Sequence, residues 1–215
     1  MRIPDSATKP QLVAILRGVT PDQVLGVAEV LYRAGIRTIE IPLNSPDPFA
    51  SIQALAAVGH EDCLVGAGTV LNVDDVKRSW QAGGRLIVAP NCDNAVIDAA
   101  LGLGMQVLPG IATATEAFSA IRAGARALKL FPATTYGPKH LSALRAVLPA
   151  TVGVFAVGGI GASDIPAWLA AGAAGFGFGS ELFHPSYCLT DIERRSNHLV
   201  EALREASPSA ASNRS

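Results

Sequence analysis

Residues 122–132 read RAGARALKLFP, so that a helical segment ends at Gly124 and an apolar strand pattern follows it. Glycine readily adopts the left-handed conformation in which many helices end. The same ending, an alanine followed by a glycine, recurs at Gly35, Gly83 and Gly172, each time shortly before another apolar run. The chain therefore repeats a unit of helix, glycine and strand along its length.

The repeated unit predicts eight strands separated by helices. The strands are expected over residues 13–17, 38–43, 64–70, 86–90, 106–110, 127–131, 153–158 and 175–179. Several intervening helices begin with a capping residue and a proline, as at Thr20-Pro21 and Ser45-Pro46. Strands that alternate with helices pair in parallel, and eight such units favour a closed (β/α)8 TIM barrel. An open, doubly wound sheet is the alternative.

A single domain is expected, because no linker or shift in composition interrupts the repeat. The barrel is predicted to occupy residues 1–205, with its eighth helix over residues 190–205. Residues 206–215 are small and mostly polar, and they are predicted to form a disordered tail.

Composition excludes several classes of function. A formal net charge of -1 and the lack of a basic run argue against nucleic-acid binding. The sequence shows neither a signal-peptide pattern nor an apolar run of about 18 residues. Neither export nor a membrane span is therefore expected. Cys63, Cys92 and Cys188 lack metal-ligand spacing and are interpreted as reduced thiols of a cytoplasmic protein. The four histidines are scattered, so no metal site is expected.

Lys129 is the one charged residue in the predicted strand 127–131. Because side chains alternate along a strand, Lys129 shares a face with Ala127 and Phe131. A desolvated lysine loses part of its preference for the charged form and becomes a nucleophile towards a carbonyl carbon. A lysine in a structural ion pair is the commoner case, so both interpretations stay open for this residue alone.

Three other polar residues lie on predicted strands or at their ends. Arg17, Glu40 and Thr69 lie on or at the end of three other predicted strands, and the active site of a TIM barrel lies at the carboxyl ends of its strands. Taken singly, Arg17 and Glu40 could form a buried ion pair, and Thr69 could cap a strand. Together with Lys129 they supply an amine, a carboxylate and a guanidinium, which suits carbonyl chemistry on an anionic substrate.

Glycine-rich turns follow the last two predicted strands, at Gly158-Gly159 and at Gly179-Ser180. In TIM barrels this region often binds phosphate through backbone N–H groups, and glycine allows a close approach of the anion. The turns therefore predict a phosphate site, although closely packed turns also use glycine.

With these residues in place, the sequence resembles the family of 2-keto-3-deoxy-6-phosphogluconate and 2-dehydro-3-deoxy-6-phosphogalactonate aldolases, over about residues 12–183. Five motifs carry the resemblance: Ile15-Leu16-Arg17-Gly18, Glu40-Ile41-Pro42-Leu43-Asn44-Ser45, Gly66-Ala67-Gly68-Thr69-Val70, Lys129-Leu130-Phe131-Pro132 and Phe155-Ala156-Val157-Gly158-Gly159. The resemblance implies a class I aldolase that needs no metal and no cofactor. Such an enzyme cleaves a phosphorylated 2-keto-3-deoxy sugar acid to pyruvate and glyceraldehyde 3-phosphate, usually as a homotrimer.

The resemblance also implies a role for individual residues. Lys129 would form the Schiff base, and Glu40 would move protons through a water. The remaining residues would bind the substrate: Arg17 and Thr69 by direct contact, Pro90 and Phe131 by shaping the pocket, and Gly158, Gly159 and Ser180 at the phosphate.

Two positions, Asn44 and Val157, separate branches of the family. The phosphogluconate branch typically has arginine and threonine there, and this chain resembles the phosphogalactonate branch. The phosphogalactonate substrate is therefore favoured, with the phosphogluconate epimer or dual specificity as alternatives. A sugar-phosphate isomerase or synthase without an imine, or a non-catalytic sugar-phosphate binder, are more distant alternatives.

Overall fold

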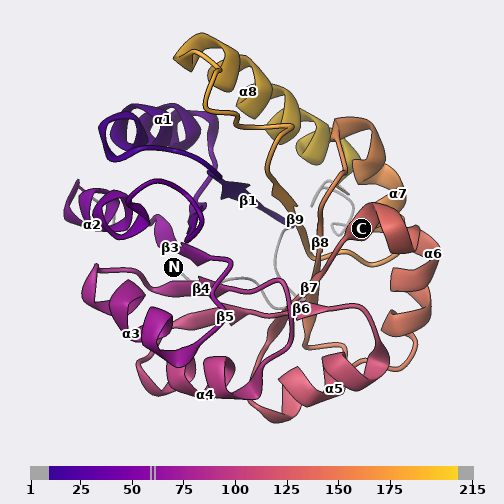
Figure 1. Cartoon of the computed structure of the whole chain (residues 1–215). Helices are drawn as coiled ribbons and strands as arrows, with labels where there is room; N and C mark the ends of the chain where they lie inside the picture. Colours follow the sequence, from indigo (N-terminus) through magenta and orange to yellow (C-terminus); the bar gives the residue numbers. More distant parts are fainter. Residues whose placement is uncertain (1–9, 59, 61, 208–215) are drawn as a thin grey trace, which may run out of the picture.

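A computed structural model describes residues 10–58, 60 and 62–207. Within these residues a single sheet of nine parallel strands is surrounded by eight α-helices and one short 3-10 helix (Figure 1). In chain order the elements are β1 (Gln11–Ile15), α1 (Pro21–Ala34), β2 (Thr38–Pro42), α2 (Pro48–Val58), β3 (Leu64–Gly68), α3 (Val73–Gln81), β4 (Leu86–Val88), α4 (Asn94–Gly102), β5 (Gln106–Leu108), β6 (Gly110–Ile111), α5 (Ala114–Arg122), β7 (Ala127–Leu130), α6 (Ala133–Arg145), β8 (Gly153–Val157), η1 (Ala162–Asp164), α7 (Ile165–Ala170), β9 (Gly175–Phe178) and α8 (Leu189–Ala206).

The sheet closes into a barrel through an interrupted fifth strand. The neighbours run in the order β5-β4-β3-β2-β1-β9-β8-β7-β6, so β5 and β6 stand at its two ends. These two strands are consecutive in the chain and are separated by Pro109, which has no N–H to donate to a neighbouring strand. Its carbonyl still accepts a 2.8 Å hydrogen bond from the N–H of Lys129 on β7. The predicted (β/α)8 barrel is therefore confirmed, and the open sheet is wrong.

Two apolar layers follow from the alternation of side chains along the strands. The larger layer lies between the sheet and the surrounding helices, and it includes Leu128 and Leu130 of β7. The smaller layer fills the barrel and contains Val13, Ile15, Leu64, Leu86, Val88, Leu108, Ala127, Phe155 and Val157. Ala127 belongs to the inner layer and Leu128 to the outer one. Because Lys129 shares a face with Ala127, its side chain faces the inside of the barrel.

Helix ends match the pattern that revealed the repeat. Gly35 and Gly124, which follow α1 and α5, both have a φ of 100°. The Gly35 N–H donates to carbonyls in the last turn of α1, which satisfies groups that the end of the helix leaves unpaired. These glycines turn the chain from each helix into the next strand.

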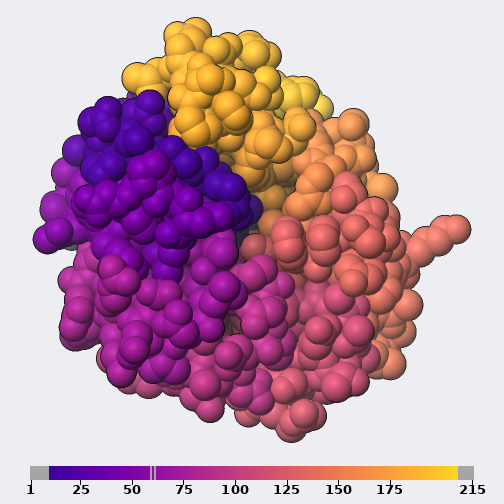
Figure 2. Space-filling view, viewed as in Figure 1, coloured from indigo at the N-terminus to yellow at the C-terminus, as the bar shows by residue number. Residues whose placement is uncertain are grey.

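The first and last helices lie side by side and complete the outer ring. In Figure 2 the indigo residues of α1 are packed directly beside the yellow residues of α8, and the two helices share an extensive contact. The last helix, predicted over residues 190–205, runs one residue further at each end. Residues 1–9 and 208–215, which include most of the predicted tail, lie outside the described residues. No helix in the described ranges is long and apolar enough to cross a membrane.

Candidate active site

Glu40 and Lys129 both point into the barrel. Their chain neighbours, Ile39 and Ile41 on β2 and Leu128 on β7, belong to the outer apolar layer, so alternation turns the two charged side chains inward. Only 1% of Glu40 and 6% of Lys129 is exposed. A carboxyl and an amine are rarely buried so deeply unless they are paired or used in chemistry.

Burial shifts the pKa of both groups in the direction that favours the uncharged form. Loss of solvation raises the pKa of Glu40 from 4.5 to about 7, although the positive charges of Lys129 and Arg17 oppose the rise. Loss of solvation also lowers the pKa of Lys129, an effect that Glu40 opposes and Arg17 reinforces. The site thus holds a carboxyl that changes charge near pH 7 beside an amine with a weakened hold on its proton.

One oxygen of Glu40 is left without a partner. In the described part of the chain, the buried Oε2 atom accepts no hydrogen bond. An unpaired buried oxygen is costly to stability, and such atoms are uncommon in native structures. Oε2 is therefore able to accept a proton, or a hydrogen bond from a hydroxyl group, of a bound molecule.

The amine of Lys129 lies near the ring of Phe131. Its Nζ atom is 4.9 Å from the ring centroid, within the range of an attraction between a cation and an aromatic face. The turn after β8 lies against the same ring, because a Cβ built on Gly158 would be 3.1 Å from Phe131 Cε2. Phe131 thus connects the amine to the predicted phosphate turn.

Arg17 and Asn44 are joined across the loops that follow β1 and β2. The Arg17 guanidinium donates a hydrogen bond to the Asn44 side-chain oxygen, and the Gly18 N–H donates to the Ser45 hydroxyl at 2.9 Å. Both Arg17 and Asn44 are exposed at the rim of the barrel. Both residues were predicted at the site, but the hydrogen bond between them was not.

Thr69 has an unusual backbone conformation. Its φ is 57°, in the left-handed region that a β-branched residue rarely adopts. Such strain costs about 1–3 kcal/mol and is found preferentially at functional sites. The residue directly follows β3, so this turn places it at the predicted end of the barrel.

The predicted phosphate turns have free donors. Gly158 and Gly159 have φ values of 103° and 72°, which favour glycine. Within the described ranges, the backbone N–H groups of Gly159 and Ser180 donate no hydrogen bond. The N–H of Gly161 is taken, because it donates to Asp164 Oδ2 at 2.8 Å. The N–H groups of Gly159 and Ser180 are therefore available to an anion.

Pro90 and Val157 border the site from two other strands. Pro90 follows β4 and is half-buried, and a Cβ on Gly110 would overlap its carbonyl group. Val157 ends β8 with 3% of its surface exposed, and it packs against Gly177. The residues predicted from the sequence thus all lie at or near the carboxyl ends of the strands.

A family model also matches this sequence. The model described as KDPG and KHG aldolase matches residues 3–194, which is most of the chain. The chain belongs to the KDPG and KHG aldolase family. The predicted family and the predicted enzyme class, an aldolase, are confirmed.

Sequence identity is higher to a phosphogalactonate aldolase than to a phosphogluconate aldolase. This aldolase is 46% identical to the 2-dehydro-3-deoxy-6-phosphogalactonate aldolase of Escherichia coli (strain K12), covering 93% of this chain and 97% of that protein. It is 31% identical to the 2-dehydro-3-deoxy-phosphogluconate aldolase of Treponema pallidum (strain Nichols), covering 74% and 76%. A solved structure described as native KDPGal has a TM-score of 0.90 and 46% identity, covering 93% and 97% of the two chains.

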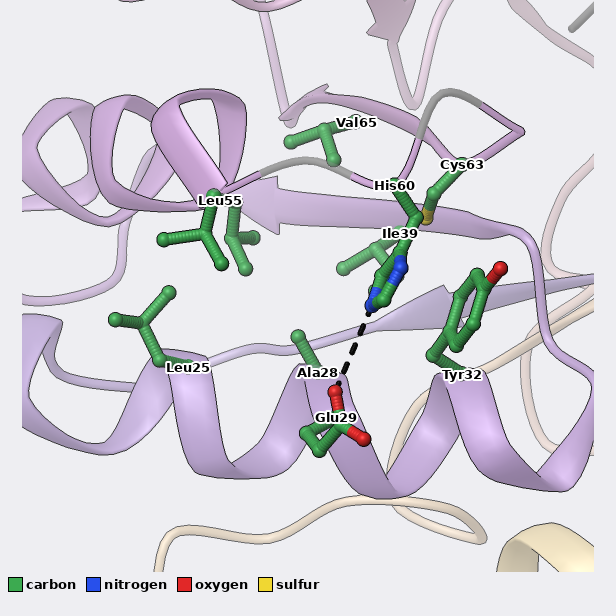
Figure 3. Close-up of a pocket in the computed structure, with 10 residues that line it drawn as sticks. Leu25, Ala28, Glu29, Tyr32, Ile39, Leu55, His60, Cys63 and Val65 are labelled. Carbon is green, nitrogen blue, oxygen red and sulfur yellow. Dashed lines mark ion pairs between the residues drawn. The ribbon is translucent and has the colours of Figure 1, made fainter.

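An apolar pocket of this aldolase lies elsewhere, between α1 and α2 (Figure 3). Its wall includes Ile39, which faces outward from β2, so the pocket is on the opposite side of the sheet from Glu40. His60 at its edge stacks on Tyr32 at a centroid distance of 3.4 Å and forms a 3.5 Å ion pair with Glu29. The Tyr32 hydroxyl donates a 2.9 Å hydrogen bond to Asp62, so the polar groups at this edge have partners, in contrast to Oε2 of Glu40.

Proposed function

We propose that this aldolase cleaves 2-dehydro-3-deoxy-6-phosphogalactonate to pyruvate and D-glyceraldehyde 3-phosphate through a Schiff base on Lys129. The observation that carries the proposal is that the Lys129 amine and the Glu40 carboxyl are both buried inside one barrel. Burial lowers the pKa of the amine and raises the pKa of the carboxyl, so both favour the uncharged form. The name of the E. coli relative supports the choice of substrate.

The first step joins Lys129 to the substrate. Because its pKa is lowered, the amine loses its proton more readily than an exposed lysine and can attack the keto carbon C2. The resulting carbinolamine loses water to form an imine, which becomes a cation when protonated. That cation attracts electrons from the neighbouring C3–C4 bond, so the imine prepares this bond for cleavage.

Glu40 accepts the proton that cleavage releases. As its carboxylate takes the C4 hydroxyl proton, directly or through a water, the C3–C4 bond breaks and its electron pair forms an enamine. Glyceraldehyde 3-phosphate leaves as the aldehyde. The proton then passes from Glu40 to C3, and hydrolysis of the imine releases pyruvate and the free amine.

The remaining residues bind and orient the substrate. Arg17, held by Asn44, and Thr69 would contact the polar groups near the keto acid, and Pro90 and Phe131 would shape the pocket around the imine. The N–H groups of Gly159 and Ser180, with the turn at Gly158 and the Ser180 hydroxyl, would hold the phosphate.

Comparing the two C4 epimers tests the substrate. We expect kcat/KM for the phosphogalactonate substrate to exceed that for the phosphogluconate epimer, and Val157→Thr to reduce this ratio about tenfold. The added hydroxyl offers a hydrogen bond to the second epimer at a buried position beside the site. Pyruvate release from each purified epimer, measured by a coupled lactate dehydrogenase assay, gives both ratios.

The matched control for this substitution is Val147→Thr, because Val147 is 57% exposed and lies after α6. The ratio should be unchanged in the control. A wild-type preference for the phosphogluconate epimer would contradict the proposed substrate, and equal rates would indicate dual specificity.

If Ser180 binds the phosphate, Ser180→Ala should lower kcat/KM by about 10- to 150-fold, since a hydrogen bond to a charged group contributes about 1.5–3 kcal/mol. The loss should disappear with a 4-hydroxy-2-keto acid that carries no phosphate. Ser142→Ala on the exposed face of α6 is the control. Equal losses with both substrates would remove Ser180 from the phosphate site.

We also infer a cytoplasmic location and a homotrimer. The location is supported by three cysteines that are all unpaired in the structure, Cys63, Cys92 and Cys188. The trimer is supported by the family resemblance, and sedimentation equilibrium of the purified chain measures it.

A further inference from the structure

We infer that Gly68 is a positioning residue for Glu40, because its bare Cα provides the surface on which the carboxylate lies. The inference rests on the role proposed for Glu40. It concerns a residue on the neighbouring strand that touches Glu40 but none of the reacting atoms assigned above.

The register of β2 and β3 explains the contact. Glu40 pairs with Gly66, and Pro42 pairs with Gly68, so Gly68 is one inward-facing position further towards the carboxyl end. A Cβ built on Gly68 would overlap Glu40 Oε2 and Cδ and would lie 2.6 Å from Oε1. The side chain of Glu40 therefore leans along the barrel and across to β3, and its whole carboxyl group lies against Gly68.

The backbone gives no separate reason for glycine at this position. Gly68 is not among the described glycines with positive φ, so an L-residue can adopt its conformation. Its carbonyl accepts a 2.8 Å hydrogen bond from the Leu43 N–H, which ties the ends of β3 and β2 together. Because the strands are held, a methyl group at Gly68 would have to displace the carboxyl group of Glu40.

The same contact explains the state of the carboxyl group. Oε2 is the atom closest to the Cβ built on Gly68, and it is also the buried oxygen without a hydrogen-bond partner. The Cα of glycine lies against this oxygen without offering a donor. Gly68 therefore fixes the position of the general base and leaves this oxygen without a donor from β3, which favours a neutral carboxyl.

The decisive experiment combines Gly68→Ala with Glu40→Gln in a double-mutant cycle. In the wild-type background, we expect Gly68→Ala to lower kcat about 100-fold, since misplacement by about 1 Å can cost this much. KM should change less than about threefold, and borohydride should still trap pyruvate on Lys129. In the Glu40→Gln background the second substitution should lower kcat less than about threefold, because no general base remains to be displaced.

The outcomes separate this inference from the proposed function. If Glu40→Gln lowers kcat but Gly68→Ala leaves it unchanged, the positioning role is wrong and the proposed function stands. Equal losses from Gly68→Ala in both backgrounds would show a general effect on the barrel and would also overturn the role. A Glu40→Gln variant with full activity would instead overturn the proposed role of Glu40.

Folding is checked with a substitution that restores space. Gly102→Ala is the control, because a Cβ at the end of α4 would meet no atom within 4 Å. If Gly68→Ala does not fold, the pair Glu40→Ala and Gly68→Ala decides the question by thermal unfolding. A folded pair supports the contact with Glu40, and an unfolded pair overturns it, provided that Glu40→Ala alone is folded. If it is not, Glu40→Ser, which also removes the carboxyl group from Gly68, replaces it in both variants.

Discussion

Lys129→Met is expected to lower kcat at least ~10⁴-fold and to abolish the trapping of pyruvate by borohydride. Methionine has a similar length but no amine, so the imine cannot form. Within the described residues Lys129 is the only buried lysine, since both Lys77 and Lys139 are exposed. Peptide mass spectrometry after reduction locates the adduct, and the coupled assay measures the rate.

Lys77→Met is the matched control, because Lys77 is a solvent-exposed lysine paired with Asp74 on α3. Both its activity and its adduct should equal those of the wild type. Activity retained by Lys129→Met would exclude the Schiff base and would favour a barrel enzyme that acts without an imine. A thermal unfolding curve for Lys129→Met shows whether a lost rate comes from lost chemistry.

Most of the barrel could be predicted from local pattern. Alternation in ALKLF placed Lys129 on the inner face, and the glycines at the helix ends marked where each strand begins. These features depend on neighbours in the chain, so the sequence contains them. The interruption at Pro109 was not predicted, because it depends on how one strand divides its hydrogen bonds between β4 and β7.

The site was predicted as a set of residues but not as a set of contacts. The hydrogen bond from Arg17 to Asn44, the left-handed Thr69 and the contact between Gly68 and Glu40 each depend on distances across strands. One signal was present in the sequence. Gly66 and Gly68 share the inner face of β3, and two bare positions there indicate that something else fills the space.

Glu40→Gln is expected to lower kcat about 10³-fold while borohydride still traps pyruvate on Lys129. The amide keeps the shape of the side chain but cannot accept the C4 hydroxyl proton. In the wild type, log kcat/KM should fall with a slope of about 1 as the pH drops below about 7, where Glu40 becomes protonated. A profile measured from pH 5 to 9 should lose this fall in the variant.

The same substitution should stabilise the folded protein, and the sign follows from the raised pKa. In the unfolded chain Glu40 loses its proton near pH 4.5, whereas in the fold it keeps it until about pH 7. Stability therefore falls as the pH rises between these values, and the buried charge costs about 3 kcal/mol above pH 7. Glutamine avoids this cost, so urea unfolding should give Glu40→Gln a free energy of unfolding about 3 kcal/mol higher at pH 8 and nearly the same at pH 4. The exposed Glu205→Gln should show no such difference. A Glu40→Gln variant that is less stable than the wild type at pH 8 would contradict the raised pKa of Glu40. The expected gain in the free energy of unfolding means that the wild-type protein gives up stability to keep its general base buried.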